Sequence, residues 1–269
     1  MWALEQPCRE RPAPLLADTP ATLLAALAGA LAVTAALVAQ GVLPRAALDV
    51  AGVAAGHGAL LATALAWATG GRAWPGLVAV ALLTLAAVAA RGHPLGLVAY
   101  AAPPLWLARV AARGHLAALG FVGGVRARHV AAGAAFGALL GGHLLVSASR
   151  TLRVAIGGRP LAELLGALAY DAGANVIAAE CFFRGALFGR AQRRWSFAAA
   201  TAVSTAAYVL RYLADPLLPG SVAFVVGAVF YLALLGAVNC WLLRWSGSLV
   251  PGLTGALVFF AAWRLLDAR

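Results

Sequence analysis

The 269-residue chain has no lysine, few acidic residues and no histidine after His143. Charged residues make up only 11% of it, whereas hydrophobic residues make up 63%. Soluble domains have about a quarter of their residues charged, so this composition excludes an ordinary soluble protein and predicts an integral membrane protein. The three cysteines have no paired spacing, which argues against a disulfide framework and against a zinc knuckle.

All 20 basic residues are arginine, and the net charge is +11. Together with the abundance of alanine, glycine and leucine, this indicates a GC-rich coding bias rather than selection for guanidinium groups. The charge is therefore weak evidence for a nucleic-acid partner, and we expect none. The arginines lie mostly in short clusters between apolar runs, where they set topology and contact lipid headgroups.

Apolar segments long enough to cross a bilayer alternate with short polar connections. They predict an all-α polytopic transmembrane bundle of eight or nine spans. The first segment lacks the basic start of a signal peptide, so we expect it to be retained. Within the spans, His57 and His143 are expected to be neutral and hydrogen-bonded to a neighbouring helix. The predicted spans are residues 20–43, 47–69, 74–91, 94–112, 129–148, 161–189, 196–213, 221–243 and 248–266.

The distribution of arginine predicts the orientation. With nine spans, eleven arginines in the connections or at the span ends fall on one side of the membrane and seven on the other. The richer side includes the cluster at 190–194, so we expect the N-terminus and this cluster to be cytoplasmic. We expect a bacterial inner (plasma) membrane protein in contact with the lipid bilayer. Its parts are an N-terminal tail (1–19), hydrophobic N-terminal helices (20–119) and a helical core (120–269).

Glu180 and Arg184 are the most informative pair in this apolar sequence. They are four residues apart, so a helix places them on one face. Inserting a charged side chain at the centre of a membrane costs about 2.5 kcal/mol or more, which makes intramembrane ionisable residues functional candidates. Asp171 and Asn175 also share a face, and we expect them to form interhelical hydrogen bonds. Glu180 lies opposite them on an ideal helix, so a single site would require a break, which Gly173 could help to form.

Three stretches after residue 120 carry a family resemblance. Residues 179–185 read Ala-Glu-Cys-Phe-Phe-Arg-Gly, a glycine-rich run spans 227–236, and residues 244–249 read Arg-Trp-Ser-Gly-Ser-Leu. They resemble the Glu-Glu-x-x-x-Arg motif, the glycine-spaced helix and the Arg-x-x-Gly-Ser-Leu turn of the CAAX-protease and bacteriocin-processing (CPBP, or abortive-infection) family. The resemblance implies an α-helical intramembrane endopeptidase in which the motif glutamate activates a water. Two downstream histidines and an Asn or Asp complete such a site.

The chain departs from that family pattern at both histidines. Ala179 replaces the leading glutamate of the first motif. In the second motif, Phe-x-x-x-His, Tyr208 stands at the Phe and Tyr212 at the His. In the third, His-x-x-x-Asn, Ala256 stands at the His and Phe260 at the Asn. Alanine and phenylalanine neither bind a metal nor carry a proton, and tyrosine is a poor base at neutral pH.

Three interpretations of Glu180 and Arg184 stay open. They form an ion pair that the core of the fold needs, a working site with substitute groups, or a binding site without catalysis. The substitute groups would be Tyr212, Arg211, Asp215 or Asn239. We therefore assign Glu180 and Arg184 as candidate catalytic residues, assign Tyr208, Tyr212 and Asn239 as candidate substrate-binding residues, and expect neither a metal nor a cofactor.

The missing imidazoles favour a divergent CPBP member that has lost standard peptidase chemistry. We expect it to bind a hydrophobic or lipidated peptide, or a membrane protein, in the former substrate cavity. The alternative is an active intramembrane endopeptidase that cleaves peptide or prenylated-protein substrates with a substituted active site. A transporter is not favoured, because no inverted repeat with matched broken helices is visible.

Overall fold

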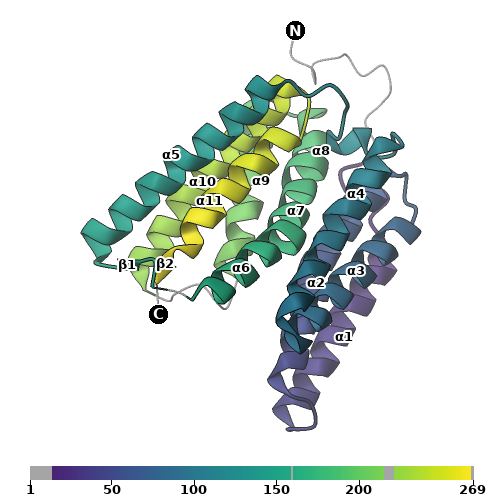
Figure 1. The fold of residues 1–269 in the computed structure, drawn as a ribbon. Helices are drawn as coiled ribbons and strands as arrows, with labels where there is room; N and C mark the ends of the chain where they lie inside the picture. Colours follow the sequence, from purple (N-terminus) through teal and green to yellow (C-terminus); the bar gives the residue numbers. More distant parts are fainter. Residues whose placement is uncertain (1–13, 159, 215–220, 268–269) are drawn as a thin grey trace.

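The computed structural model describes residues 14–158, 160–214 and 221–267 (Figure 1). All nine predicted apolar segments form helices within these ranges, which confirms the all-α bundle. Two short strands also pair in an antiparallel ladder. The elements are α1 (Ala21–Ala39), α2 (Arg45–Ala68), α3 (Trp74–Gly92), η1 (Pro94–Ala101), α4 (Ala102–Ala112), η2 (Ala117–Leu119), α5 (Ala127–Leu152), β1 (Ala155–Ile156), α6 (Leu161–Tyr170), η3 (Asp171–Asn175), α7 (Val176–Ala179), η4 (Glu180–Phe188), α8 (Gly189–Gln192), α9 (Phe197–Leu213), α10 (Val222–Ser246), α11 (Val250–Arg264) and β2 (Leu266–Asp267).

Seven helical segments in the described ranges are long and apolar enough to cross a membrane. Two of the predicted spans are shorter: α9 has 17 residues and α11 has 15. A 15-residue helix rises about 22 Å, whereas the hydrocarbon core is about 30 Å thick. The outermost helix, α1, has no buried residue, as expected for an apolar helix in contact with lipid.

The helices form three groups that lie side by side (Figure 1). One group comprises α1 to α4, and another comprises α5, α9, α10 and α11. The continuous segment from α6 to α8 runs between them, with α2 packed on α7 and η4, and with α9 and α11 in contact with the same segment. The stretch at 179–185 therefore lies in the middle of the protein.

Two glycines of α5 allow close contact with α11. A Cβ at Gly133 would collide with the carbonyl oxygen of Pro251, and a Cβ at Gly137 would collide with that of Gly255. Small residues four apart let membrane helices approach each other closely. Glycine at these two positions therefore allows the backbones of α5 and α11 to pack in direct contact.

The turn between α10 and α11 is fixed by its own residues and by a distant loop. Gly247 has φ +71°, a left-handed conformation that glycine adopts readily. The Ser248 hydroxyl accepts a hydrogen bond from Val250 N at 3.2 Å. Leu249 N donates to the carbonyl oxygen of Gly120 at 2.9 Å. This turn folds α11 back along α10, so that both helices face η4.

Arg190 joins the N-terminal segment to α8. Its Nη1 donates to the carbonyl oxygens of Leu15 at 3.2 Å and Ala17 at 2.6 Å. Its Nη2 donates to the carbonyl oxygen of Trp67 at 3.3 Å. The described N-terminal residues and Arg190 therefore lie at the same end of the bundle. The predicted topology also puts the N-terminus and the arginine cluster at 190–194 on one side of the membrane.

Candidate functional site

The segment from α6 to α8 contains two stretches of widened helix, η3 and η4. In such π-helical turns the backbone hydrogen bonds join residues five apart instead of four, and these turns are frequent at functional sites. Gly173 lies in η3, where an added Cβ would collide with the backbone of Tyr100. The helix that carries Asp171 and Glu180 therefore departs from ideal α-helical geometry in both stretches.

Glu180 and Arg184 form a buried ion pair on η4. Arg184 Nε lies 3.7 Å from Glu180 Oε2, and the two side chains are 0% and 1% exposed, in the order Arg184 and Glu180. Neither makes a hydrogen bond to the described residues. Removing one member of a buried ion pair costs about 3–5 kcal/mol, because the other charge is left uncompensated. The pair is therefore tied to the stability of the fold.

Three helices close around this ion pair. The Tyr208 ring of α9 lies under the Arg184 guanidinium, with Cζ 3.8 Å from the ring centroid. On α10, a Cβ at Gly236 would lie 2.7 Å from Arg184 Nη2. On α11, a Cβ at Gly252 would lie 3.5 Å from Glu180 Oε2. The two glycines thus provide the space that the ion pair fills.

Four buried side chains here leave polar atoms without a partner in the described part of the chain, and we call them the Glu180 cluster. They are Glu180, Arg184, Thr205 and Asn239. Asn239 Nδ2 donates to the carbonyl oxygen of Gly252 at 3.2 Å, but its Oδ1 accepts no hydrogen bond from described residues. Buried polar groups normally bond to protein or to ordered water. The cluster therefore has hydrogen-bonding capacity for a small polar molecule.

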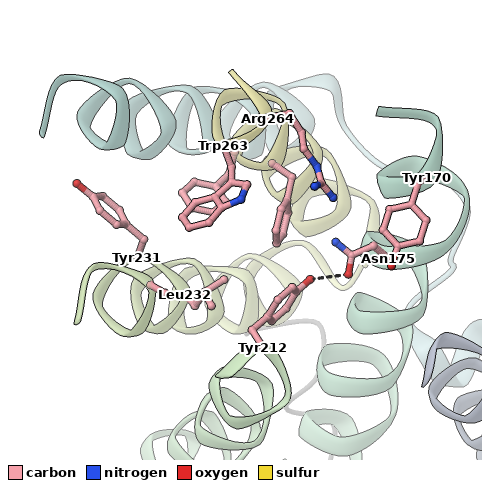
Figure 2. A pocket seen from close by; sticks show the side chains of 10 residues that line it. Tyr170, Asn175, Tyr212, Tyr231, Leu232, Trp263 and Arg264 are labelled. Carbon is pink, nitrogen blue, oxygen red and sulfur yellow. Dashed lines mark hydrogen bonds between the residues drawn. The ribbon is translucent and has the colours of Figure 1, made fainter. Parts of the chain in front are cut away.

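A second set of polar residues, the Asp171 cluster, comprises Asp171, Asn175, Tyr212 and Arg264. Arg264 Nε donates to Asp171 Oδ2 at 2.7 Å, and Nη2 donates to Oδ1 at 2.8 Å. Asn175 Nδ2 donates to Asp171 Oδ1 at 3.0 Å. The Tyr212 hydroxyl donates to Asn175 Oδ1 at 3.0 Å (Figure 2). The predicted interhelical hydrogen bonding of Asp171 and Asn175 is confirmed.

Two tyrosines of α9 connect the clusters. Tyr208 contacts Arg184 in one cluster, and Tyr212 bonds Asn175 in the other. Their rings pack edge to face, with centroids 4.9 Å apart. The polar residues of η3 and η4 are therefore joined through α9, and they need not share one face of their own helix.

A cavity of about 110 Å³ lies beside the Asp171 cluster (Figure 2). Its walls come from α6, η3, α9, α10 and α11, and they are mostly aromatic. Neither Glu180 nor Arg184 is among its lining residues. Residues that line it include Tyr170, Asn175, Tyr212, Tyr231, Trp263 and Arg264.

Neither position that corresponds to a family histidine carries an imidazole. Tyr212 stacks on Phe260 with ring centroids 5.4 Å apart, and Ala256 is fully buried. In the described ranges, no three His, Cys, Asp or Glu side chains gather where a metal ion could be held. The carboxylates of the two clusters, Glu180 and Asp171, each face a guanidinium. These residues do not fit a metal ion, and we derive no step through one.

The five assigned site residues all lie within or between the two clusters, although their roles stay predictions. Arg211 lies apart from the clusters: its Nη2 is 3.2 Å from His57 Nδ1, and its guanidinium is 4.2 Å from the Tyr212 ring centroid. Asp215 lies outside the described residues. Arg211 therefore contacts the site through the Tyr212 ring and through His57, which bonds the cavity residue Tyr170.

The role of Arg264 was not predicted from the sequence, where this residue entered only the count of arginines on each side of the membrane. The structure instead pairs Arg264 with Asp171. A signal was available, because Arg264 follows Phe260 by four residues and therefore shares its helical face. Extending the third motif by one turn would have identified it.

The two histidines inside apolar spans bond to neighbouring helices, as predicted. His57 Nε2 lies 2.5 Å from the Tyr170 hydroxyl, and His143 Nδ1 lies 2.8 Å from the Tyr231 hydroxyl. Both tyrosines line the cavity. The histidines thus hold two walls of the cavity from outside.

Comparison with known families supports the resemblance seen in the sequence. Residues 161–263 match the family described as type II CAAX prenyl endopeptidase Rce1-like. This segment includes Glu180, Arg184, both tyrosines of α9 and Asn239. Comparisons with curated proteins and with solved structures gave no match. Residues 161–263 therefore match an Rce1-like domain, which is consistent with the resemblance to the CPBP family.

Proposed function

We propose that this CAAX-protease-like membrane protein binds a hydrophobic or lipidated peptide within the bilayer and does not cleave it by the usual chemistry of its family. One observation carries the proposal: Glu180 does not line the cavity beside Tyr212. A general base must lie within hydrogen-bond reach of the water that it activates beside the substrate. A peptide bond held in this cavity would meet tyrosine and amide groups in place of a carboxylate.

The composition of the cavity supports a binding role. Aromatic and aliphatic walls with a few polar groups are typical of ligand sites. The Tyr212 hydroxyl, which stands where the family has an imidazole, already donates its proton to Asn175. The polar groups here are thus arranged to bind and orient a ligand.

The test uses the protein reconstituted in lipid nanodiscs with fluorescent hydrophobic peptides, with and without a lipid anchor. We expect saturable binding, intact peptide by mass spectrometry, and no change in either result with the double variant Glu180→Gln and Arg184→Met, which leaves no buried charge uncompensated. Tyr212→Ala should weaken binding because it removes a wall of the cavity. The matched control is Leu105→Ala, an exposed residue of α4. Cleavage that disappears with Glu180→Gln would contradict the proposal.

A second candidate function is peptide hydrolysis by a substituted site. It is favoured by the unpartnered atoms of the Glu180 cluster, between which a water would find a carboxylate and an amide oxygen. Arg184 would then stabilise the developing oxyanion. This function requires turnover that both Glu180→Gln and Asn239→Ala abolish, in protein that remains folded.

We further propose that the protein lies in a bacterial inner membrane with its N-terminus in the cytoplasm. The excess of arginine at the end that holds Arg190 supports this orientation. Single cysteines placed at Arg193 and Arg150, both exposed, would report it. A membrane-impermeant thiol reagent applied to intact spheroplasts should label position 150 and leave position 193 unlabelled, with the native cysteines replaced.

A further inference from the structure

The cavity beside the Asp171 cluster has an uneven distribution of hydrogen-bond donors and acceptors. The Asp171 carboxylate accepts three hydrogen bonds, two from Arg264 and one from Asn175. Asn175 Oδ1 accepts from Tyr212. Each of these carboxylate and amide oxygens therefore already accepts at least one hydrogen bond from the protein.

The donors are not all occupied. A guanidinium carries five N–H groups, and Arg264 uses only Nε and one hydrogen of Nη2 on Asp171. Its Nη1 has no hydrogen-bond partner among the described residues, and its side chain is 23% exposed beside the cavity. A ligand at this end must therefore present an acceptor oxygen.

The charge of the site limits which acceptor fits. Asp171 already compensates the charge of Arg264 at 2.7 Å. A carboxylate or phosphate would place a second negative charge close to Asp171 where water is scarce, which is costly. A neutral carbonyl oxygen meets Nη1 without that repulsion.

The apolar walls and the small volume of the cavity limit which chemical group can be attached to the carbonyl. Beyond Arg264 the lining is apolar, with Leu232, Phe259 and Trp263. The volume of about 110 Å³ is below the roughly 150 Å³ of an engineered cavity that binds benzene, and well below the roughly 300 Å³ at the lower end of drug-sized sites. A slender chain fits this space, and several peptide residues do not.

We propose that this cavity binds the acyl group of an acylated peptide, with the carbonyl oxygen on Arg264 Nη1 and the first methylenes between the aromatic walls. The inference rests on the proposed function and names its ligand class. A prenyl group joined through a thioether has no carbonyl beside its chain, so it leaves the Arg264 donor unpaired. Arg264 is then the residue that distinguishes acyl from prenyl anchors.

The experiment compares matched peptides on the full chain in nanodiscs made of ether-linked lipids, which contain no competing ester carbonyl. One peptide carries a serine with a hexadecanoyl ester, its twin carries a hexadecyl ether on the same serine, and a third has no lipid. Because a hydrogen bond to a charged group is lost, we expect the ester peptide to bind about tenfold more tightly than the ether peptide. A farnesylated peptide should bind like the ether peptide.

Two double variants test the role of Arg264. Asp171→Asn with Arg264→Met removes both charges together and also removes the donor at position 264, so it should reduce the ester preference to about onefold. The control is Asp49→Asn with Arg91→Met, the same change in an exposed ion pair between α2 and α3, which should keep the preference. A preference that survives in the Arg264 double variant would overturn the assignment.

The other outcomes separate this inference from the function on which it rests. Equal affinity for ester and ether peptides overturns the acyl assignment and leaves peptide binding standing. Absence of binding for all peptides overturns both. An ester preference that is present in ether-lipid discs but absent in ester-lipid discs means that a bilayer lipid fills the cavity, which overturns the assignment to a peptide.

Discussion

The two polar clusters of the domain differ in how their charged groups are buried and hydrogen-bonded. In the Glu180 cluster, a guanidinium and a carboxylate lie 3.7 Å apart, fully enclosed, with unpartnered polar atoms. In the Asp171 cluster, Arg264 binds a carboxylate through two hydrogen bonds and stays partly exposed beside a cavity. The motif that carries the family resemblance is thus the closed one. The open cluster contains a residue outside the family motifs, which teaches that a conspicuous motif and an accessible site need not coincide.

The largest expected effect is the loss of stability when the buried charge of Arg184 is removed from the Glu180 cluster. Arg184→Met leaves Glu180 charged and buried, and should lower the free energy of unfolding by about 3–5 kcal/mol. The double variant Glu180→Gln with Arg184→Met removes both charges and should recover most of that loss. Chemical unfolding in detergent, followed by tryptophan fluorescence, measures both. A single variant as stable as the double one would show that the pair is not coupled.

The next effect concerns the helix contact that positions α11 for both clusters. Gly137→Leu places a side chain against the backbone of Gly255 and should cost about 1–3 kcal/mol by overpacking. Gly142 lies on the same helix with nothing within 4 Å of an added Cβ, so Gly142→Leu is the control. Equal unfolding free energies for the two variants would argue against close α5–α11 packing.

A smaller effect is expected from the shape of the open cluster. Arg264→Lys keeps the charge but cannot bind Asp171 through a planar fork, so we expect a loss of about 1.5 kcal/mol. The loss should be smaller than that of Arg184→Met, measured in the same unfolding assay. A reversed order would mean that the Asp171 cluster is the one on which the fold depends more.

The smallest effect tests the link through α9. Tyr212→Phe removes the hydroxyl that donates to Asn175 while keeping the ring stacked on Phe260. Interhelical hydrogen bonds in membranes contribute about 0.6 kcal/mol on average, and we expect a loss of that size. A loss above about 2 kcal/mol would show that Tyr212 does more than join two helices.

The fold class and the approximate ends of the nine apolar segments that form helices in the described ranges could be predicted from the sequence, because apolar runs of membrane length are hard to place elsewhere. The pairing of Glu180 with Arg184 followed from their spacing. The widened turns of η3 and η4 could not be predicted, because they depend on tertiary contacts such as Gly173 against Tyr100. The same holds for the pairing of Asp171 with Arg264, since 93 residues separate them.

The contact of Arg190 with the carbonyl oxygens of Leu15 and Ala17 has a practical consequence. These carbonyl groups belong to the segment just before α1, while Arg190 ends the helix that carries Glu180 and Arg184. Replacing Arg190 would remove these hydrogen bonds and so separate the segment before α1 from the helix that carries the buried ion pair.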